Sequence, residues 1–180
     1  DALNNAGNFL KDLAKKQSMI LAIGTIPAAQ ASVAAFAKKC GCLYVTERWL
    51  GGTLTNFKTI SQRIQYYIKL KADRASGKLE KYTKKERLMF DREIARLDEF
   101  FVGLEAMSRL PDAVLIINTN EHSTAVREAK RLHIPIVGII NTDTDPEPIQ
   151  YPIPANNNAV ASIRWILDRL AGKIEEGMKE

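Results

Sequence analysis

Short apolar runs alternate along the chain with stretches in which apolar residues have helical spacing. The apolar runs predict strands buried on both faces, as in a parallel sheet, at residues 18–24, 43–45, 113–117 and 136–140. Apolar positions three or four residues apart predict helices at residues 2–16, 28–39, 123–132 and 157–171. Strands and helices that alternate in this order predict an α/β fold with right-handed crossovers.

The segment between the second and third strands has a different pattern. Two successive helices are predicted there, with apolar seams at Phe57, Ile60, Ile64 and Tyr67 and at Phe90, Ile94, Leu97, Phe101 and Leu104. Residues 73–82 between them are polar, and Thr83 and Glu86 have the spacing of a capping box at a helix start. Two facing seams joined by a turn predict an antiparallel hairpin, a coiled-coil arm that reaches about 30 Å.

We therefore expect one discontinuous α/β domain, formed by residues 1–52 and 111–180, with a basic helical hairpin inserted over residues 53–110. Neither α/β part is large enough to form a core alone, so both should contribute strands to one sheet. Residues 141–154 carry four prolines and predict a loop with at most a short strand near Tyr151. The polar tail from Lys173 is expected to fray.

Charge is concentrated on the predicted arm. The net charge of the chain is +5, whereas ten basic and three acidic residues give +7 over residues 58–87, which leaves −2 for the rest. A solvated helix surface is the simplest interpretation, but a projecting arm with interleaved tyrosines favours contact with phosphates, and shape recognition of folded RNA in particular. The residues predicted to bind RNA are Arg48, Lys58, Arg63, Lys69, Lys71, Arg74, Lys78, Lys81, Lys84, Lys85 and Arg87.

The corner where the chain enters the arm holds residues that fix backbone geometry. Trp49 is expected in the core, and Gly51 and Gly52 are expected to form a left-handed turn, which glycine adopts at little cost. Asn56 stands where the helical spacing begins. Trp49, Gly51, Gly52 and Asn56 are therefore predicted to form a structural hinge, flanked by the RNA contacts Arg48 and Lys58.

Signals for a small-molecule site are weak. Gly24 and Thr25 follow a strand and precede a helix, the place where α/β folds bind phosphates. However, no glycine-rich or Walker pattern is present, and Pro27 removes an amide donor. An α/β enzyme or sensor that binds a phosphorylated small molecule at Gly24 and Thr25 is the alternative hypothesis.

Signals for metal or acid–base chemistry are also weak. Cys40 and Cys42 are predicted to be structural, because no second pair of thiols or imidazoles completes a zinc site. His122 is expected on the surface at a helix start, and the carboxylates between residues 143 and 147 belong to a turn. No metal and no cofactor are predicted, apart from magnesium that accompanies bound RNA. No apolar run approaches the roughly 20 residues of a membrane span.

The string Glu47-Arg-Trp-Leu-Gly-Gly-Thr-Leu-Thr-Asn-Phe57 resembles the signature of the bacterial-type ribosomal protein two family of the small subunit. The resemblance continues in the family's order over nearly the whole chain, at residues 82–86, 110–113, 125–129, 134–136, 143–146 and 153–154. It implies a flavodoxin-like, doubly wound parallel sheet with a protruding coiled-coil hairpin. It also implies a structural role in translation and no catalysis.

The partners that the resemblance implies are small-subunit rRNA, neighbouring small-subunit ribosomal proteins and, in bacteria, ribosomal protein one. No membrane and no small-molecule substrate are implied, and the location is the bacterial cytoplasmic ribosome or, alternatively, a mitochondrial or plastid ribosome. The sequence departs from the family at Ile26 and Pro27, where the family has a basic pair. An RNA-binding regulator outside the ribosome remains the third hypothesis.

Overall fold

The computed structural model describes residues 1–179. Five strands form one parallel sheet in the order β2-β1-β3-β4-β5. They are β1 (Ile20–Ile23), β2 (Leu43–Val45), β3 (Ala113–Ile117), β4 (Ile136–Ile140) and β5 (Tyr151–Pro154). The helices are α1 (Ala2–Lys15), α2 (Pro27–Cys40), α3 (Phe57–Ala75), α4 (Lys84–Phe101), α5 (Ser123–Arg131) and α6 (Val160–Lys179), with short 3-10 helices η1 (Lys78–Lys81) and η2 (Val102–Leu104). The predicted α/β, flavodoxin-like fold is confirmed.

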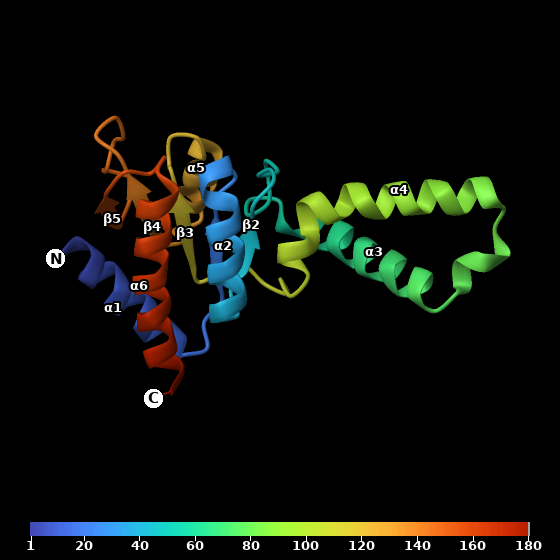
Figure 1. Cartoon of the computed structure of the whole chain (residues 1–180), viewed down its shortest axis with the longest axis horizontal. Coiled ribbons are helices and arrows are strands. Elements are labelled where there is room, and N and C mark those ends of the chain that lie inside the picture. The colour runs from blue at the N-terminus through green and yellow to red at the C-terminus, as the bar shows by residue number, and fades with distance from the viewer. Residues whose placement is uncertain (180) are drawn as a thin grey trace.

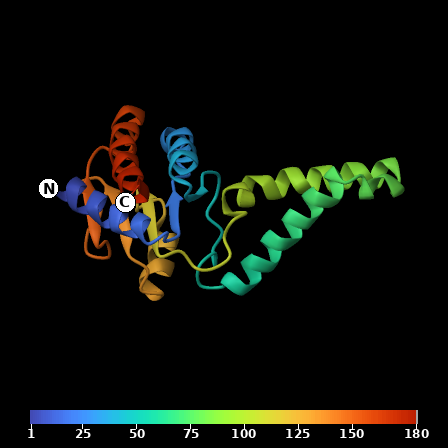
Figure 2. The same ribbon diagram turned by 90° about the horizontal axis from the view of Figure 1, so that it is seen from below.

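The central strands β1, β3 and β4 are buried on both faces because alternate residues pack in different layers. In β1, Ile20 and Ala22 pack in a cluster with α1, α2 and α6. Leu21 and Ile23 point the other way, into a cluster with α3, α4 and α5. Figure 2 shows α2 and α6 on one side of the sheet and α5 on the other. The unbroken apolar runs in the sequence therefore indicate a three-layer fold, in which helices cover both faces of the sheet.

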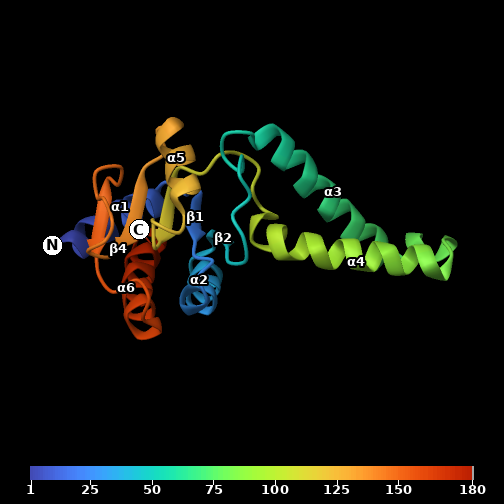
Figure 3. The same ribbon diagram turned by 90° about the horizontal axis from the view of Figure 1, so that it is seen from above.

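Helices α3 and α4 project from the sheet as an arm, defined here as residues 57–101 (Figure 1). The two helices are inclined to each other, since their ribbons separate toward the tip in Figure 1 and toward the sheet in Figure 3. At the root, Ile64 and Phe101 belong to the same buried cluster as the sheet residue Leu21. Because β2 and β3 flank β1, their connection crosses this face of the sheet, and the root of the arm supplies the covering layer there. Farther out, no residue between 71 and 93 is buried.

Local signals in the sequence specify several element ends. The capping box is confirmed, since the side chains of Thr83 and Glu86 each bond the other's backbone amide. Gly41 ends α2 in the left-handed conformation with φ of 64°. The strand near Tyr151 is confirmed as β5.

The predicted fraying of the tail from Lys173 is wrong, because α6 continues to Lys179. Ile174 is fully buried against the layer that contains α1. Gly177 is also buried, and a Cβ at this position would lie 2.4 Å from the carbonyl oxygen of Lys11. Packing against α1 thus stabilises a segment whose composition alone favours disorder.

Candidate nucleic-acid interface

The eleven basic residues predicted to bind RNA are distributed along the arm and at its corner. Ten of them are exposed and Lys71 is half-buried. Arg48 lies in the loop after β2, and the other ten lie on α3, on the tip and in the first turn of α4. Their positions are compatible with the predicted role.

Three of these cations pair with carboxylates of the chain itself. Their partners are Glu105 for Lys71 at 2.7 Å, Asp91 for Arg74 at 3.0 Å and Asp73 for Lys78 at 3.3 Å. The Tyr67 hydroxyl donates to Asp98 and accepts from Lys71, so α3 and α4 are also linked by this polar contact. Of the three pairs only Arg74 with Asp91 links α3 to α4, and all three cations are partly neutralised before any partner binds.

The other eight cations form no ion pair within residues 1–179. They are Arg48, Lys58, Arg63, Lys69, Lys81, Lys84, Lys85 and Arg87. Arg63 lies over the ring of Phe101 at 5.8 Å and Lys81 over that of Tyr82 at 5.3 Å, which orients two of them without cancelling their charge. Seven of the eight are on the arm or its tip.

The corner itself is held by Glu128 of α5, a residue that no sequence signal singled out. Its Oε1 accepts hydrogen bonds from the Trp49 indole at 3.1 Å and from the Gly52 amide at 2.9 Å. Its Oε2 accepts from the Leu54 amide at 3.0 Å and from the amide and hydroxyl of Thr55 at 3.1 and 3.2 Å. Glu128 is only 7% exposed. One buried carboxylate therefore organises the whole loop that leads into α3.

These contacts fix the charge state of Glu128. Burial by itself raises the pKa of a carboxyl group, because the charged form loses hydration. The amides of Gly52, Thr55 and Leu54 together with the Trp49 indole outweigh burial and hold the pKa of Glu128 below its ordinary value. The group is thus an anion at neutral pH and accepts five hydrogen bonds.

The predicted hinge is corrected in two respects. Trp49 is half-buried rather than fully in the core, because its indole N–H must reach Glu128 while its ring packs on the core. Only Gly52 of the glycine pair has a left-handed backbone, with φ of 89°. Asn56 does not cap α3 with its side chain, which accepts a hydrogen bond from the Thr59 hydroxyl at 3.0 Å.

We expect the two hinge glycines to respond differently to alanine. A Cβ at Gly51 meets no atom within 4 Å, whereas one at Gly52 lies 3.3 Å from Asn56 Cβ on a left-handed backbone. Gly52→Ala should cost about 1–2 kcal/mol of unfolding free energy and Gly51→Ala less than about 0.5 kcal/mol. Urea unfolding followed by circular dichroism measures both. Equal midpoints for the two variants would contradict this account of the turn.

A cleft of about 320 Å³ opens at the carboxyl edge of the sheet, where α/β folds of this type bind ligands. It is lined by Thr25, Glu47, Arg48, Trp49, Gly51, Glu121, His122 and Thr124. The Gly24 amide donates to the carbonyl of Val45 at 3.0 Å, and the Thr25 amide donates to His122 Nε2 at 3.2 Å. The amides of Gly24 and Thr25, which the alternative hypothesis assigns to a phosphate, are therefore already used.

His122 is buried, with 3% of its surface exposed, so the expectation of a surface histidine is wrong. Its Nδ1 lies 2.8 Å from the carbonyl of Asn118. That carbonyl only accepts, so Nδ1 carries the proton and Nε2 is left to accept from Thr25. Burial lowers the pKa of His122, which keeps the ring neutral. The imidazole thus takes up the Thr25 amide, one of the donors that the phosphate hypothesis requires.

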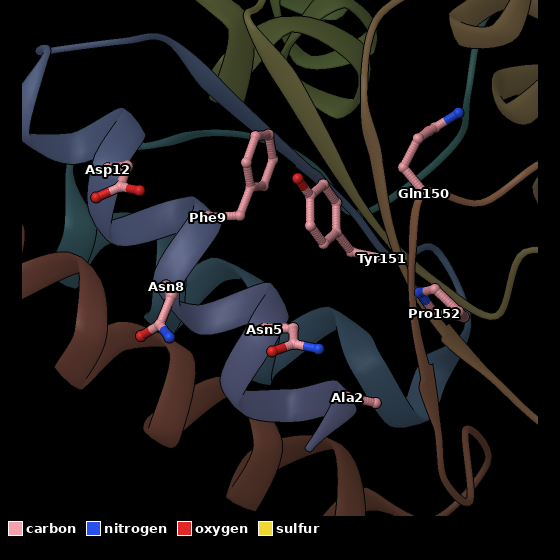
Figure 4. Close-up of a pocket in the computed structure, with 8 residues that line it drawn as sticks. All are labelled: Ala2, Asn5, Asn8, Phe9, Asp12, Gln150, Tyr151 and Pro152. Carbon is pink, nitrogen blue, oxygen red and sulfur yellow. The ribbon is translucent and has the colours of Figure 1, made fainter.

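A cavity of about 620 Å³ lies between α1 and β5 (Figure 4). The rings of Phe9 and Tyr151 stack there with centroids 4.2 Å apart. Its polar side-chain groups are three amides, the Tyr151 hydroxyl and the carboxylate of Asp12, with no cation among the lining residues. It contains none of the predicted RNA-binding residues and offers nothing that suits a polyanion.

Residues 1–179 contain neither a candidate metal cluster nor a candidate membrane span. No group of three or more His, Cys, Asp or Glu side chains in this range could hold a metal ion. Cys40 and Cys42 are free thiols. None of the helices in this range is both long and apolar enough to cross a membrane.

The fold and the distribution of charge define an α/β protein with a projecting cationic helical arm. The chain belongs to the family described as Ribosomal protein S2, whose profile matches residues 1–177. It is a ribosomal protein of the small subunit rather than an enzyme, as the sequence predicted.

The curated relatives are bacterial. The chain is 43% identical over 175 residues to small ribosomal subunit protein uS2 of Dictyoglomus thermophilum and, equally, to that of Dictyoglomus turgidum, which covers 97% of this chain and 71% of either relative. It is 40% identical over 177 residues to uS2 of Coprothermobacter proteolyticus, which covers 98% of this chain and 66% of that relative. The predicted similarity to the bacterial type is confirmed.

Proposed function

We propose that this ribosomal protein binds small-subunit rRNA through the unpaired cations of the arm and through Arg48 at its corner. The observation that carries the proposal is the set of eight exposed cations without a carboxylate partner in residues 1–179, seven of them on the arm or its tip. Cations that are not neutralised within the protein are the ones that release counterions when they meet phosphates.

The absence of a core in the outer arm supports the same role. Residues 71–93 include no buried side chain, so few apolar contacts within the chain hold this region in place. Phosphate contacts would add the missing restraint. The root, in contrast, is buried in the core and gives the arm a fixed attachment to the sheet.

The proposal predicts that reversing three unpaired cations weakens assembly. Lys69→Glu, Lys81→Glu and Lys85→Glu combined should lower affinity for small-subunit rRNA about 10- to 100-fold and reduce the slope of log K against log salt by about two to three. Filter binding at several salt concentrations measures affinity, and sedimentation measures incorporation into small subunits.

The matched control reverses Lys16, Lys38 and Lys130, which are exposed and lie off the arm. It changes the net charge by the same amount, so it separates local contact from general electrostatic attraction. Equal loss in both variants, or unchanged incorporation of the arm variant, would refute the arm as the site of RNA contact.

Further parts of the proposal rest on the family membership and the bacterial relatives. They are docking of ribosomal protein one, contact with neighbouring small-subunit proteins, magnesium held with the rRNA, and location in the bacterial cytoplasmic ribosome. The amount of ribosomal protein one on small subunits with and without this chain tests the first of them. Equal amounts on both kinds of subunit would remove it.

A further inference from the structure

Helix α3 presents one line of side chains directly away from the core. Lys58, Gln62, Gln65 and Lys69 are spaced by four, three and four residues, so they form a single stripe along the helix. The stripe lies opposite the buried residues Ile60, Ile64 and Tyr67. All four side chains are exposed. None of them makes a hydrogen bond or ion pair with any part of residues 1–179.

The two helices of the arm differ in charge. Helix α3 has five basic residues and one acid, Asp73, which gives +4. Helix α4 has five basic and five acidic residues, which gives 0. No acid occurs between Phe57 and Ala72, so nothing along the stripe repels phosphate. The positive charge of the arm thus belongs to α3 and the tip rather than to both helices.

We propose that the α3 stripe lies across the minor groove of an A-form RNA duplex. This inference rests on the proposed function and narrows it to one helix face and one kind of RNA structure. The minor groove of A-form RNA is wide and shallow and displays 2′-hydroxyl groups. Lys58 and Lys69, eleven residues and about 16 Å apart along α3, contact phosphates at the two ends of the stripe.

The middle of the stripe suits the floor of that groove. A glutamine amide both donates and accepts, as a 2′-hydroxyl does, so Gln62 and Gln65 match it without placing a charge where no phosphate lies. Tyr66, half exposed at 50% and without a stacking partner in residues 1–179, flanks the glutamines with a further hydroxyl. The order cation, amide, amide, cation distinguishes this face from a uniformly basic one.

The first test replaces Gln62 and Gln65 with alanine, which favours helix and should leave the fold intact. Affinity is measured for one RNA duplex and for the DNA duplex of the same sequence. The ratio of RNA to DNA affinity should fall about 5- to 10-fold while the salt slope stays unchanged. An unchanged ratio, or no binding of the native chain to either duplex, would overturn the inference.

The second test compares two double variants. One combines Lys58→Ala with Lys69→Ala on α3, and the other combines Lys84→Ala with Lys85→Ala at the start of α4 on the same arm. The α3 pair should lower the salt slope on the RNA duplex by about two, and the α4 pair by much less. Equal effects would overturn the assignment to α3 and leave the proposed function intact. If the proposed function itself were wrong, the variant with Lys69→Glu, Lys81→Glu and Lys85→Glu would instead be fully incorporated into small subunits.

The alternative contact is an unpaired base stacked on Tyr66. If Tyr66→Ala abolished binding to single-stranded RNA, and the two glutamine substitutions left duplex binding unchanged, the minor-groove inference would be wrong.

Discussion

Glu128→Ala is expected to lower the free energy of unfolding by roughly 3–5 kcal/mol, among the largest effects of any single substitution in this chain. The carboxylate accepts five hydrogen bonds from the corner, and the amide of the buried residue Leu54 bonds only to this carboxylate within residues 1–179. Removing the acceptor leaves several donors unsatisfied at once. The loop over residues 49–55 should then lose its fixed path into α3.

The isosteric variant Glu128→Gln separates charge from shape. Its amide nitrogen would face either the two donors now on Oε1 or the three on Oε2, so a donor would replace an acceptor whichever way the group turns. We expect most of the alanine effect to persist. Denaturant unfolding followed by circular dichroism measures both variants, and Glu121→Ala, an exposed acid at the start of the same helix, is the matched control.

Acid should reproduce the effect in the native chain. The folded pKa of Glu128 is held below its unfolded value, so its stabilisation is complete above the unfolded pKa and is lost as the pH falls through the folded pKa. The native chain should therefore lose stability in that acidic window more steeply than Glu128→Gln does. Parallel pH profiles for the two proteins would show that Glu128 does not carry the corner.

The contrast between Glu128 and the strands explains what the sequence predicts well. Strand β3 is predicted from five consecutive apolar residues, a signal contained within the strand itself. The partners of Glu128 lie 73 to 79 positions away, and a single acid on a short amphipathic helix has the appearance of an ordinary solvated residue. Contacts between residues so far apart in the sequence produce no periodic pattern in it.

The same reasoning explains why the sequence could not place His122 or distinguish between the lysines of the arm. His122 is polar at a helix start, and only the parallel pairing of β1 with β3 places it against Thr25. Lys69 and Lys71 are the same residue type on the same helix, but they face different directions. Lys71 pairs with Glu105, whereas Lys69 is exposed. The sequence locates the basic arm, whereas the structure decides which cations are free.

Gly103→Ala is expected to disrupt the packing of η2 against β2, where the arm returns to the sheet. Gly103 lies in η2, where the arm returns to edge strand β2, and a Cβ there would fall 2.1 Å from the carbonyl oxygen of Tyr44 and 2.8 Å from its ring. The ring could turn away, but the carbonyl belongs to the β2 backbone, so η2 and β2 must separate. We expect a loss of about 3 kcal/mol.

The control is the same substitution at Gly172, inside α6, where a Cβ meets no atom within 4 Å. Alanine there removes the cost of glycine in a helix and should stabilise the chain by about 0.5–1 kcal/mol. Thermal unfolding should therefore shift in opposite directions for the two variants. Because η2 and Glu128 restrain the two ends of one root, Gly103→Ala should also lower incorporation into small subunits without any change in charge. Native incorporation of a destabilised Gly103→Ala chain would mean that RNA contacts alone orient the arm.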